Sequence, residues 1–374
     1  MRSPGLYVHV PYCASRCPYC DFYSGTDLGS VQDWLSGVVS EAGIYGDIFE
    51  PFGTLYLGGG TPSLLGAGEF ERFIGSLREA VRFEEGIEFT VEVNPDDLSG
   101  EKLSLYRSTG VNRLSIGVQS LDDGELRLLG RRHDAAAALH AVEAARRAGF
   151  DNIGVDLIYA IPGQTKETLR ASLECLLEHD PEHISCYELT LEPETPLSLA
   201  MEKEEISRVE EAAARELFLM ISDLLCGRGY DHYEVSNYAR GGENRSRHNT
   251  RYWDHTPYLG LGPSAHSFHS LSSSLRWWNI DETPIYCSQL GRGELAVAGR
   301  EILSESQLLL ERLYFGFRTS DGFPLELLDA LPSGRDTLLE LERTSLVRIE
   351  GDRVVPTLQG YLLSDRLPLL FSLD

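Results

Sequence analysis

The stretch YVHVPYCASRCPYC, residues 7–20, joins an apolar run to three closely spaced cysteines. The apolar run predicts a β-strand, and Cys13, Cys17 and Cys20 follow where that strand would end. A structural zinc site would need a fourth ligand, for which His9, inside the strand, is the nearest candidate. An iron–sulfur cluster normally takes four thiolates, and three would leave one iron open to another ligand. The spacing favours a cluster over zinc and leaves both possible.

Around this stretch, strand-like runs alternate with helical patterns. The predicted strands are 6–12, 54–59, 87–94, 113–119, 152–160 and 183–190, and the predicted helices are 31–43, 67–81, 99–108, 135–149, 166–178 and 203–227. Such alternation is typical of a parallel sheet with helices on its faces. Six units are fewer than the eight of a closed barrel. We therefore predict an α/β fold whose first domain, residues 1–228, is a partial (β/α)6 TIM-like barrel, with an open doubly wound sheet as the second choice.

The remainder of the chain has a different pattern. Residues 229–303 are rich in aromatics, Gly, Ser and His without a clean period, and we interpret them as a connecting region. Residues 304–374 begin with a helical stretch, and LVRIEGDRVVPT then predicts a two-stranded wing around Gly351. The fold prediction is thus a partial barrel with a C-terminal α+β extension and a small winged-helix-like domain.

Charge and composition exclude several classes of protein. The 374 residues include 33 Lys and Arg against 58 Asp and Glu, a formal charge of −25, which argues against binding nucleic acid. No apolar run is long enough for a membrane helix and no signal peptide is visible, so we expect a cytosolic protein that is not integral to a membrane. Its seven cysteines are then free thiols or metal ligands. One segment, 240–253, is locally basic and could hold an anion.

Further polar residues occur where predicted strands end. GGGTPS (58–63) follows the second strand, Glu92 and Asn94 end the third, Gln119 ends the fourth, and Asp156 lies late in the fifth. The carboxyl ends of parallel strands meet at one face, where ligands bind. The glycines would let the backbone approach a ligand and expose consecutive N–H groups, although a tight turn explains them equally well. These motifs predict one shared site.

Together, YVHVPYCASRCPYCDFYS, GGGTPS, VEVNP, SIGVQS and VDLIYAIPGQT resemble the radical S-adenosylmethionine (SAM) superfamily. The closer resemblance, over nearly the whole chain, is to the branch that contains the oxygen-independent coproporphyrinogen dehydrogenase and its haem-chaperone relatives. It implies that the three cysteines hold a [4Fe-4S] cluster whose fourth iron is chelated by SAM. The SAM contacts that the resemblance implies are Tyr7, Tyr19, Gly59, Gly60, Thr61, Glu92, Gln119, Arg131 and Asp156. Arg131 suits a carboxylate and Asp156 ribose hydroxyls, but without the resemblance Tyr7 and Tyr19 could simply pack and Arg131 could be a surface charge.

Within that branch, the details favour the chaperones. Phe22 occupies the position of a further cysteine in the dehydrogenase, and little sequence precedes Tyr7. HNTRYW, residues 248–253, matches the HNxxYW motif associated with haem binding in the chaperone group. The match implies that His248 ligates haem iron, that the aromatic residues of the motif flank the macrocycle, and that neighbouring arginines pair with its propionates. The alternative ligands are His266 and His269, and Trp277 and Trp278 are expected in the core, at a domain interface or near the haem.

We therefore expect a protein that binds haem and delivers it to recipient haem proteins, built on a radical SAM core. A coproporphyrinogen III dehydrogenase and a related radical SAM methyltransferase are the alternatives, and whether the chain is an enzyme is left open. The resemblance also implies a reduced electron donor such as flavodoxin or ferredoxin.

Overall fold

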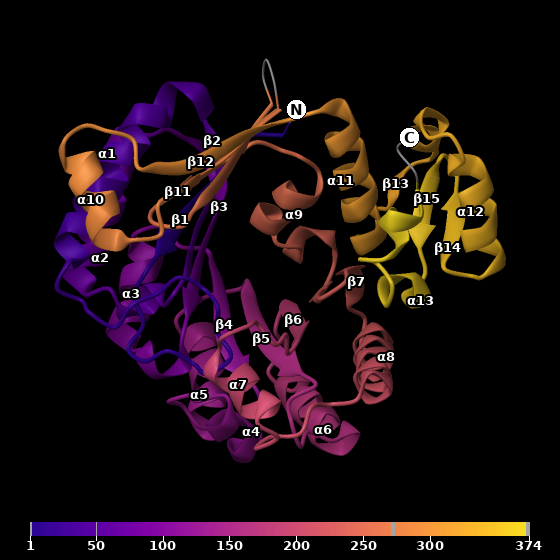
Figure 1. The fold of residues 1–374 in the computed structure, drawn as a ribbon. Helices are drawn as coiled ribbons and strands as arrows, with labels where there is room; N and C mark the ends of the chain where they lie inside the picture. The colour runs from indigo at the N-terminus through magenta and orange to yellow at the C-terminus, as the bar shows by residue number, and fades with distance from the viewer. Residues whose placement is uncertain (1, 50, 271–273, 372–374) are drawn as a thin grey trace.

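The protein is described by a computed structural model that covers residues 2–49, 51–270 and 274–371 (Figure 1). Within these residues the chain forms one sheet of 12 strands and a second sheet of three. The order of strands in the large sheet is β12-β11-β10-β9-β1-β2-β3-β4-β5-β6-β8-β7. Its strands are β1 Gly5–Val10, β2 Phe52–Gly59, β3 Phe83–Val93, β4 Arg113–Gln119, β5 Ile153–Tyr159, β6 His183–Glu188, β7 Asp231–Glu234, β8 Asn237–Ala239, β9 Tyr258–Leu261, β10 His266–His269, β11 Ser274–Asn279 and β12 Val297–Leu303.

Strands β1 to β6 are parallel neighbours, which confirms the predicted partial barrel. Alternate residues of each strand face opposite sides of the sheet. In β1, Leu6, Val8 and Val10 belong to the main hydrophobic core, whereas Tyr7 and His9 face the concave side. Helices line the outside of the curved sheet (Figure 1). The helices up to β7 are α1 Val31–Phe49, α2 Ala67–Ala80, α3 Gly100–Ser108, α4 Asp123–Leu128, α5 Ala135–Arg147, α6 Lys166–Leu177, α7 Pro196–Glu202 and α8 Glu211–Gly227.

Several helices differ from the expectation. Helix α1 continues to Phe49, past its predicted end at 43, and α7 was not predicted. The predicted helix 203–227 begins only at Glu211, because the preceding residues 203–210 are mostly charged and exposed and have no apolar face to bury. The short helix α4 was not predicted, and it is capped by the Asp122 carboxylate, which accepts hydrogen bonds from the backbone N–H groups of Gly124 and Glu125.

The segment 229–303 is more than a connection, because it supplies strands β7 to β12 to the two edges of the large sheet. Strand β9 lies parallel to β1, with Tyr7 opposite Gly260. A Cβ atom on Gly260 would lie 2.2 Å from the carbonyl oxygen of His266, so only glycine allows the tight return to β10. Helix α9, Arg247–Trp253, lies inside the curve of the sheet, and α10, Thr283–Gly291, packs on α1 outside it (Figure 1).

The C-terminal residues build a second hydrophobic core around Leu313, Phe317 and Val354. Its elements are α11 Glu305–Arg318, β13 Phe323–Pro324, α12 Gly334–Arg343, β14 Val347–Glu350, β15 Arg353–Pro356 and α13 Leu358–Tyr361. The hairpin β14–β15 is the predicted wing, with Gly351 at a φ of 62° in its turn. The domain limits at 228 and 303 stay a prediction. Residue 1 of the predicted first domain and residues 372–374 of the predicted last domain lie outside the described residues. No described helix combines the length and apolarity needed to cross a bilayer.

Candidate cofactor site

The concave side of the barrel contains a cavity of about 980 Å³ at the carboxyl ends of the strands. The cavity brings together nearly all the residues that the sequence singled out. Its lining includes Cys13, Cys17, Tyr19, Cys20, Gly59, Gly60, Thr61, Glu92, Gln119, Arg131 and Asp156. Tyr7 and His248 are not in this lining and lie behind it. Phe22 is at the cavity with 66% of its surface exposed.

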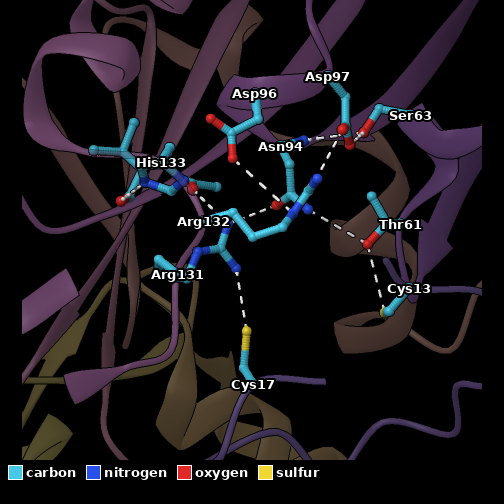
Figure 2. Close-up of polar contacts among 12 residues, drawn as sticks. Cys13, Cys17, Thr61, Ser63, Asn94, Asp96, Asp97, Arg131, Arg132 and His133 are labelled. Carbon is cyan, nitrogen blue, oxygen red and sulfur yellow. Dashed lines mark hydrogen bonds and ion pairs between the residues drawn. The ribbon is translucent and has the colours of Figure 1, made fainter. Parts of the chain in front are cut away.

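Polar donors point at two of the three thiols (Figure 2). The Thr61 hydroxyl lies 3.5 Å from the Cys13 sulfur, and Nη1 of Arg131 lies 3.7 Å from the Cys17 sulfur. Burial raises the pKa of the Cys20 thiol, and the nearby Cys17 and Cys13 add to this rise. An arginine N–H and a hydroxyl directed at sulfur are donors that also suit a metal-bound thiolate, so these two contacts fit metal ligation.

The three thiols come from one short segment and border one cavity, a pattern that is compatible with an iron–sulfur cluster. Among the described residues, no three His, Cys, Asp or Glu side chains converge on a single ion. A [4Fe-4S] cluster takes one thiolate on each iron, so its ligands do not have to meet at one point.

Arg131 is held inside the cavity by Asn94, directly after β3, and by Gly117 of β4. Its Nη2 donates to Asn94 Oδ1 at 2.5 Å and to the Gly117 carbonyl at 2.9 Å (Figure 2). Its Nε is buried and has no partner among the described residues. The alternative that Arg131 is a surface charge is therefore wrong, and its neighbour Arg132, which pairs with Asp97, takes that position.

Two carboxyl groups lie at the bottom of the cavity. Glu92 accepts hydrogen bonds from the Tyr56 hydroxyl at 2.7 Å and the Gly59 N–H at 3.2 Å, and Asp156 accepts one from Ser115 at 3.0 Å. Burial, together with the charge of Asp156, raises the pKa of Glu92 to about 7. Burial also raises the pKa of Asp156. A cationic or hydroxyl-bearing ligand would offset this desolvation, so the pair is suited to such a ligand.

The glycine-rich loop, residues 58–63, does not offer its N–H groups to a ligand as expected. Its N–H groups are not free for a ligand: Gly59 donates to Glu92, Gly60 to the Val10 carbonyl at 2.8 Å, and Thr61 to the Tyr12 carbonyl at 2.7 Å. A Cβ atom on Gly60 would lie 2.6 Å from the Tyr12 oxygen. Glycine is needed here because the loop crosses the backbone that leads into the cysteine segment.

Sequence reasoning missed part of the cavity wall, above all Arg113, which is buried at the start of β4 and lines the cavity. His183 lines it too, and its Nε2 lies 2.8 Å from the Tyr233 hydroxyl. Strand alternation could have found Arg113 and Ser115, since both share a face with the predicted Gln119. An arginine at the start of a strand looks like a surface charge, however, until the opposing strands enclose it.

His248 lies in the interior, 1% exposed. Its Nδ1 is 2.9 Å from the Thr54 hydroxyl and its Nε2 is 2.9 Å from the Tyr252 hydroxyl. Burial lowers the pKa of His248 to about 3, so the ring is neutral. Both nitrogens are thus occupied by protein groups, and haem ligation by His248 would require one of these bonds to break. Tyr7 packs beside His248, and the Tyr7 hydroxyl lies 3.1 Å from His9 Nδ1.

The arginines near HNTRYW are engaged by protein groups in this structure. Arg240 and Arg245 form ion pairs with Asp180 and Asp321. Arg251 donates to the carbonyls of Ser3 and Arg247. Arg247 likewise donates to backbone carbonyls, those of Gly86 and Gly53. The contacts of Arg247 with β2 and β3, and of Arg251 with Ser3 just before β1, attach α9 to the sheet.

Comparisons with known proteins identify the family of the chain. Residues 7–176 match the radical SAM superfamily. The haem chaperone HemW of Lactococcus lactis is 34% identical over 326 residues, which are 87% of this chain and 84% of that protein. HemW of Mycobacterium tuberculosis is 33% identical over 96% of this chain and 93% of its own length. The structure of coproporphyrinogen III oxidase (HemN) from Escherichia coli superimposes on this chain with a TM-score of 0.83 and 22% identity. The match covers 98% of this chain and 89% of that one, and it shows that the two share a fold. The chain belongs to the HemW family of radical SAM proteins.

Proposed function

We propose that this protein binds haem and delivers it to recipient haem proteins, using a radical SAM core that carries a [4Fe-4S] cluster and SAM. The observation that carries the proposal is that the three cysteines border one cavity with Glu92 and Asp156 in a chain of the HemW family. Its relatives of similar length bear the name haem chaperone.

In this proposal Cys13, Cys17 and Cys20 hold the cluster, which when bound supplies a redox-active iron with one position open for SAM. Arg131 and Thr61 stabilise the thiolates through the contacts that they make with sulfur. Glu92 and Asp156 bind the cationic and hydroxyl-bearing parts of SAM, since both carboxyl groups are buried and gain from such a partner. Tyr19, Gly59, Gly60 and Gln119 complete the walls.

We further propose a reduced electron donor, such as flavodoxin or ferredoxin, and a cytosolic location. Phe22 is a large apolar side chain exposed beside the cysteines, where a donor would have to approach.

The proposal can be tested on protein prepared without oxygen and reconstituted with iron and sulfide. We expect about four irons per chain, a change in the cluster's electron paramagnetic resonance (EPR) spectrum on adding SAM, and a haem Soret band that moves to an apo-globin when the two are mixed. Stoichiometric zinc without iron, or haem that is never bound, would contradict the proposal.

The alternatives have their own readouts in the same preparation. Carbon dioxide released from coproporphyrinogen with SAM would indicate a dehydrogenase, and a methylated product would indicate a methyltransferase. We expect neither, because Phe22 stands where the resemblance places another cysteine in the dehydrogenase, and because HNTRYW matches the motif of the chaperone group.

A further inference from the structure

We propose that haem is seated in a groove between strands β9 to β12 and helix α11, with His266 as the axial ligand of its iron. This inference rests on the proposed function and names the site at which the ligand binds. The groove has a volume of about 650 Å³, within the range of pockets for small molecules and cofactors. Among the residues that the structure describes, the lining of this groove and that of the cysteine cavity have no member in common.

The register of the sheet places the groove on the same face as the cysteine cavity. Tyr258 lies beside Gly5 of β1, in phase with Tyr7, and Phe268 lies opposite Tyr258. His266 lies opposite Trp278 on the neighbouring strand. Since directly opposed residues of a sheet share a face, these side chains point to the concave side, beyond α9.

His266 has the properties of a ligand that is ready to bind. Its residue is exposed, and within the described part of the chain neither ring nitrogen has a hydrogen-bond partner. Partial burial and then the charge of Arg276 lower the pKa of His266, so the imidazole is neutral at pH 7. A neutral imidazole with a free nitrogen is the usual axial ligand of haem iron. His248, in contrast, has both nitrogens occupied.

The walls of the groove are flat and aromatic. The Trp278 ring stacks beside His266, with centroids 5.9 Å apart and planes at 24°. Gly299 of β12 makes room for it, because a Cβ atom there would lie 2.3 Å from the indole ring. Tyr258 lines the sheet side, and Tyr314 and Phe315 line the helix side. Such surfaces suit a planar macrocycle.

The charged residues of the groove are paired with one another. Arg276 contacts Glu301 at 3.2 Å and donates twice to Glu311 at 2.9 Å. Because this arginine is already engaged by two carboxylates, it is not available to the propionates of haem. The apolar ring would therefore enter the groove while its propionates remain on the open side.

The HNxxYW motif then has a positioning role. The Tyr252 ring packs edge-on against Tyr258 at 4.7 Å, and Trp253 packs against Phe315 at 5.6 Å. His248 in turn holds the Tyr252 hydroxyl at 2.9 Å. Tyr252 thus supports the sheet side of the groove and Trp253 supports its helix side. This role would connect the motif with haem binding even though His248 does not ligate the iron.

The test is a titration of full-length, cluster-reconstituted protein with ferric haem, followed by absorption and EPR spectroscopy. In His266→Ala and His266→Gln we expect haem affinity to fall at least tenfold and the imidazole-ligand signature to disappear, and free imidazole should restore that signature in His266→Ala. His269→Ala is the matched control, because His269 is on the same strand but faces Phe49 of α1 on the other side. SAM binding by each variant checks that it is folded.

His248→Ala separates ligation from positioning. We expect it to weaken haem binding while leaving the imidazole signature in place. If the signature is lost in His248→Ala and kept in both His266 variants, the inference is wrong and the proposed function stands. If wild-type protein binds no haem at all, the inference and the proposed function both fail.

Discussion

The concave face of the large sheet has two hollows, one on each side of α9, and their chemistry is opposite. The cysteine cavity is closed in by strands β1 to β6 and contains buried carboxyl groups whose hydrogen bonds come from neighbouring strands. The groove beyond β9 is open, its walls are aromatic, and its histidine is free to bind. The first suits a polar, cationic ligand and the second a flat apolar one, so one sheet can serve two ligands that share no contact residue.

The largest expected effect is on the cluster. Cys17→Ala should remove all stably bound iron, because an iron then lacks its thiolate ligand and the Arg131 contact to sulfur is lost. Cys13→Ala and Cys20→Ala should do the same, and Cys175→Ala, in α6, should keep its iron. Iron and sulfide analysis after anaerobic desalting measures this. Haem affinity should stay within about twofold, since the groove is separate. A parallel loss of haem would refute the independence of the two sites.

The next effect concerns SAM. Glu92→Gln should weaken SAM binding by roughly 10–100-fold, because a hydrogen bond to a charged partner contributes roughly 1.5–3 kcal/mol. Burial raises the pKa of Glu92 to about 7, so the carboxyl is neutral below pH 7 and ionised above it. Wild-type SAM affinity should therefore increase between pH 6 and pH 8, and the variant should not show this increase. Calorimetry at three pH values measures both effects, and an unchanged pH profile in Glu92→Gln would exclude this carboxyl as the cause.

A smaller effect is expected in the groove. Gly299→Leu places a side chain where the Trp278 ring lies, so haem affinity should fall roughly fivefold or more while SAM affinity is unchanged. Gly291→Leu, at the end of α10, is the control, because a Cβ atom there meets nothing within 4 Å. Equal haem affinity in Gly299→Leu and wild type would show that the Trp278 wall does not contact the ligand.

The last effect is on stability, at helix α9, which separates the two hollows, and ligand affinities should change least there. Tyr252→Phe leaves His248 Nε2 buried without its hydrogen bond and should lower the free energy of unfolding by roughly 1–3 kcal/mol. Urea denaturation measures the change. Tyr314→Phe is a control, because the Tyr314 hydroxyl donates to Asp365 at an exposed position and its loss should matter less.

Much of the barrel could be predicted because its strands are long apolar runs buried on both sides. The predicted strand 113–119 agrees with β4, and Cys13, Cys17 and Cys20 are close in sequence, so their proximity needed no tertiary information. The strands of 229–303 were not predicted, because they are only three to seven residues long and show no clean alternation. Strand β9 also pairs with β1, more than two hundred positions away, as Gly260 does with Tyr7. One partner of His248, Thr54 on β2, likewise comes from a long-range contact, whereas the other, Tyr252, is four residues away.

The sequence by itself determined the alternation of strands and helices, the three-thiol segment and the polar residues at the strand ends, because local periodicity and spacing encode them. Only the tertiary structure decided which polar groups are still free to bind a ligand. It engaged both nitrogens of His248 and left those of His266 open within the described chain, and it paired the basic segment with distant carboxylates and carbonyls. The physical reason is that a side chain's availability depends on its burial and on its neighbours, and these neighbours come from remote parts of the chain.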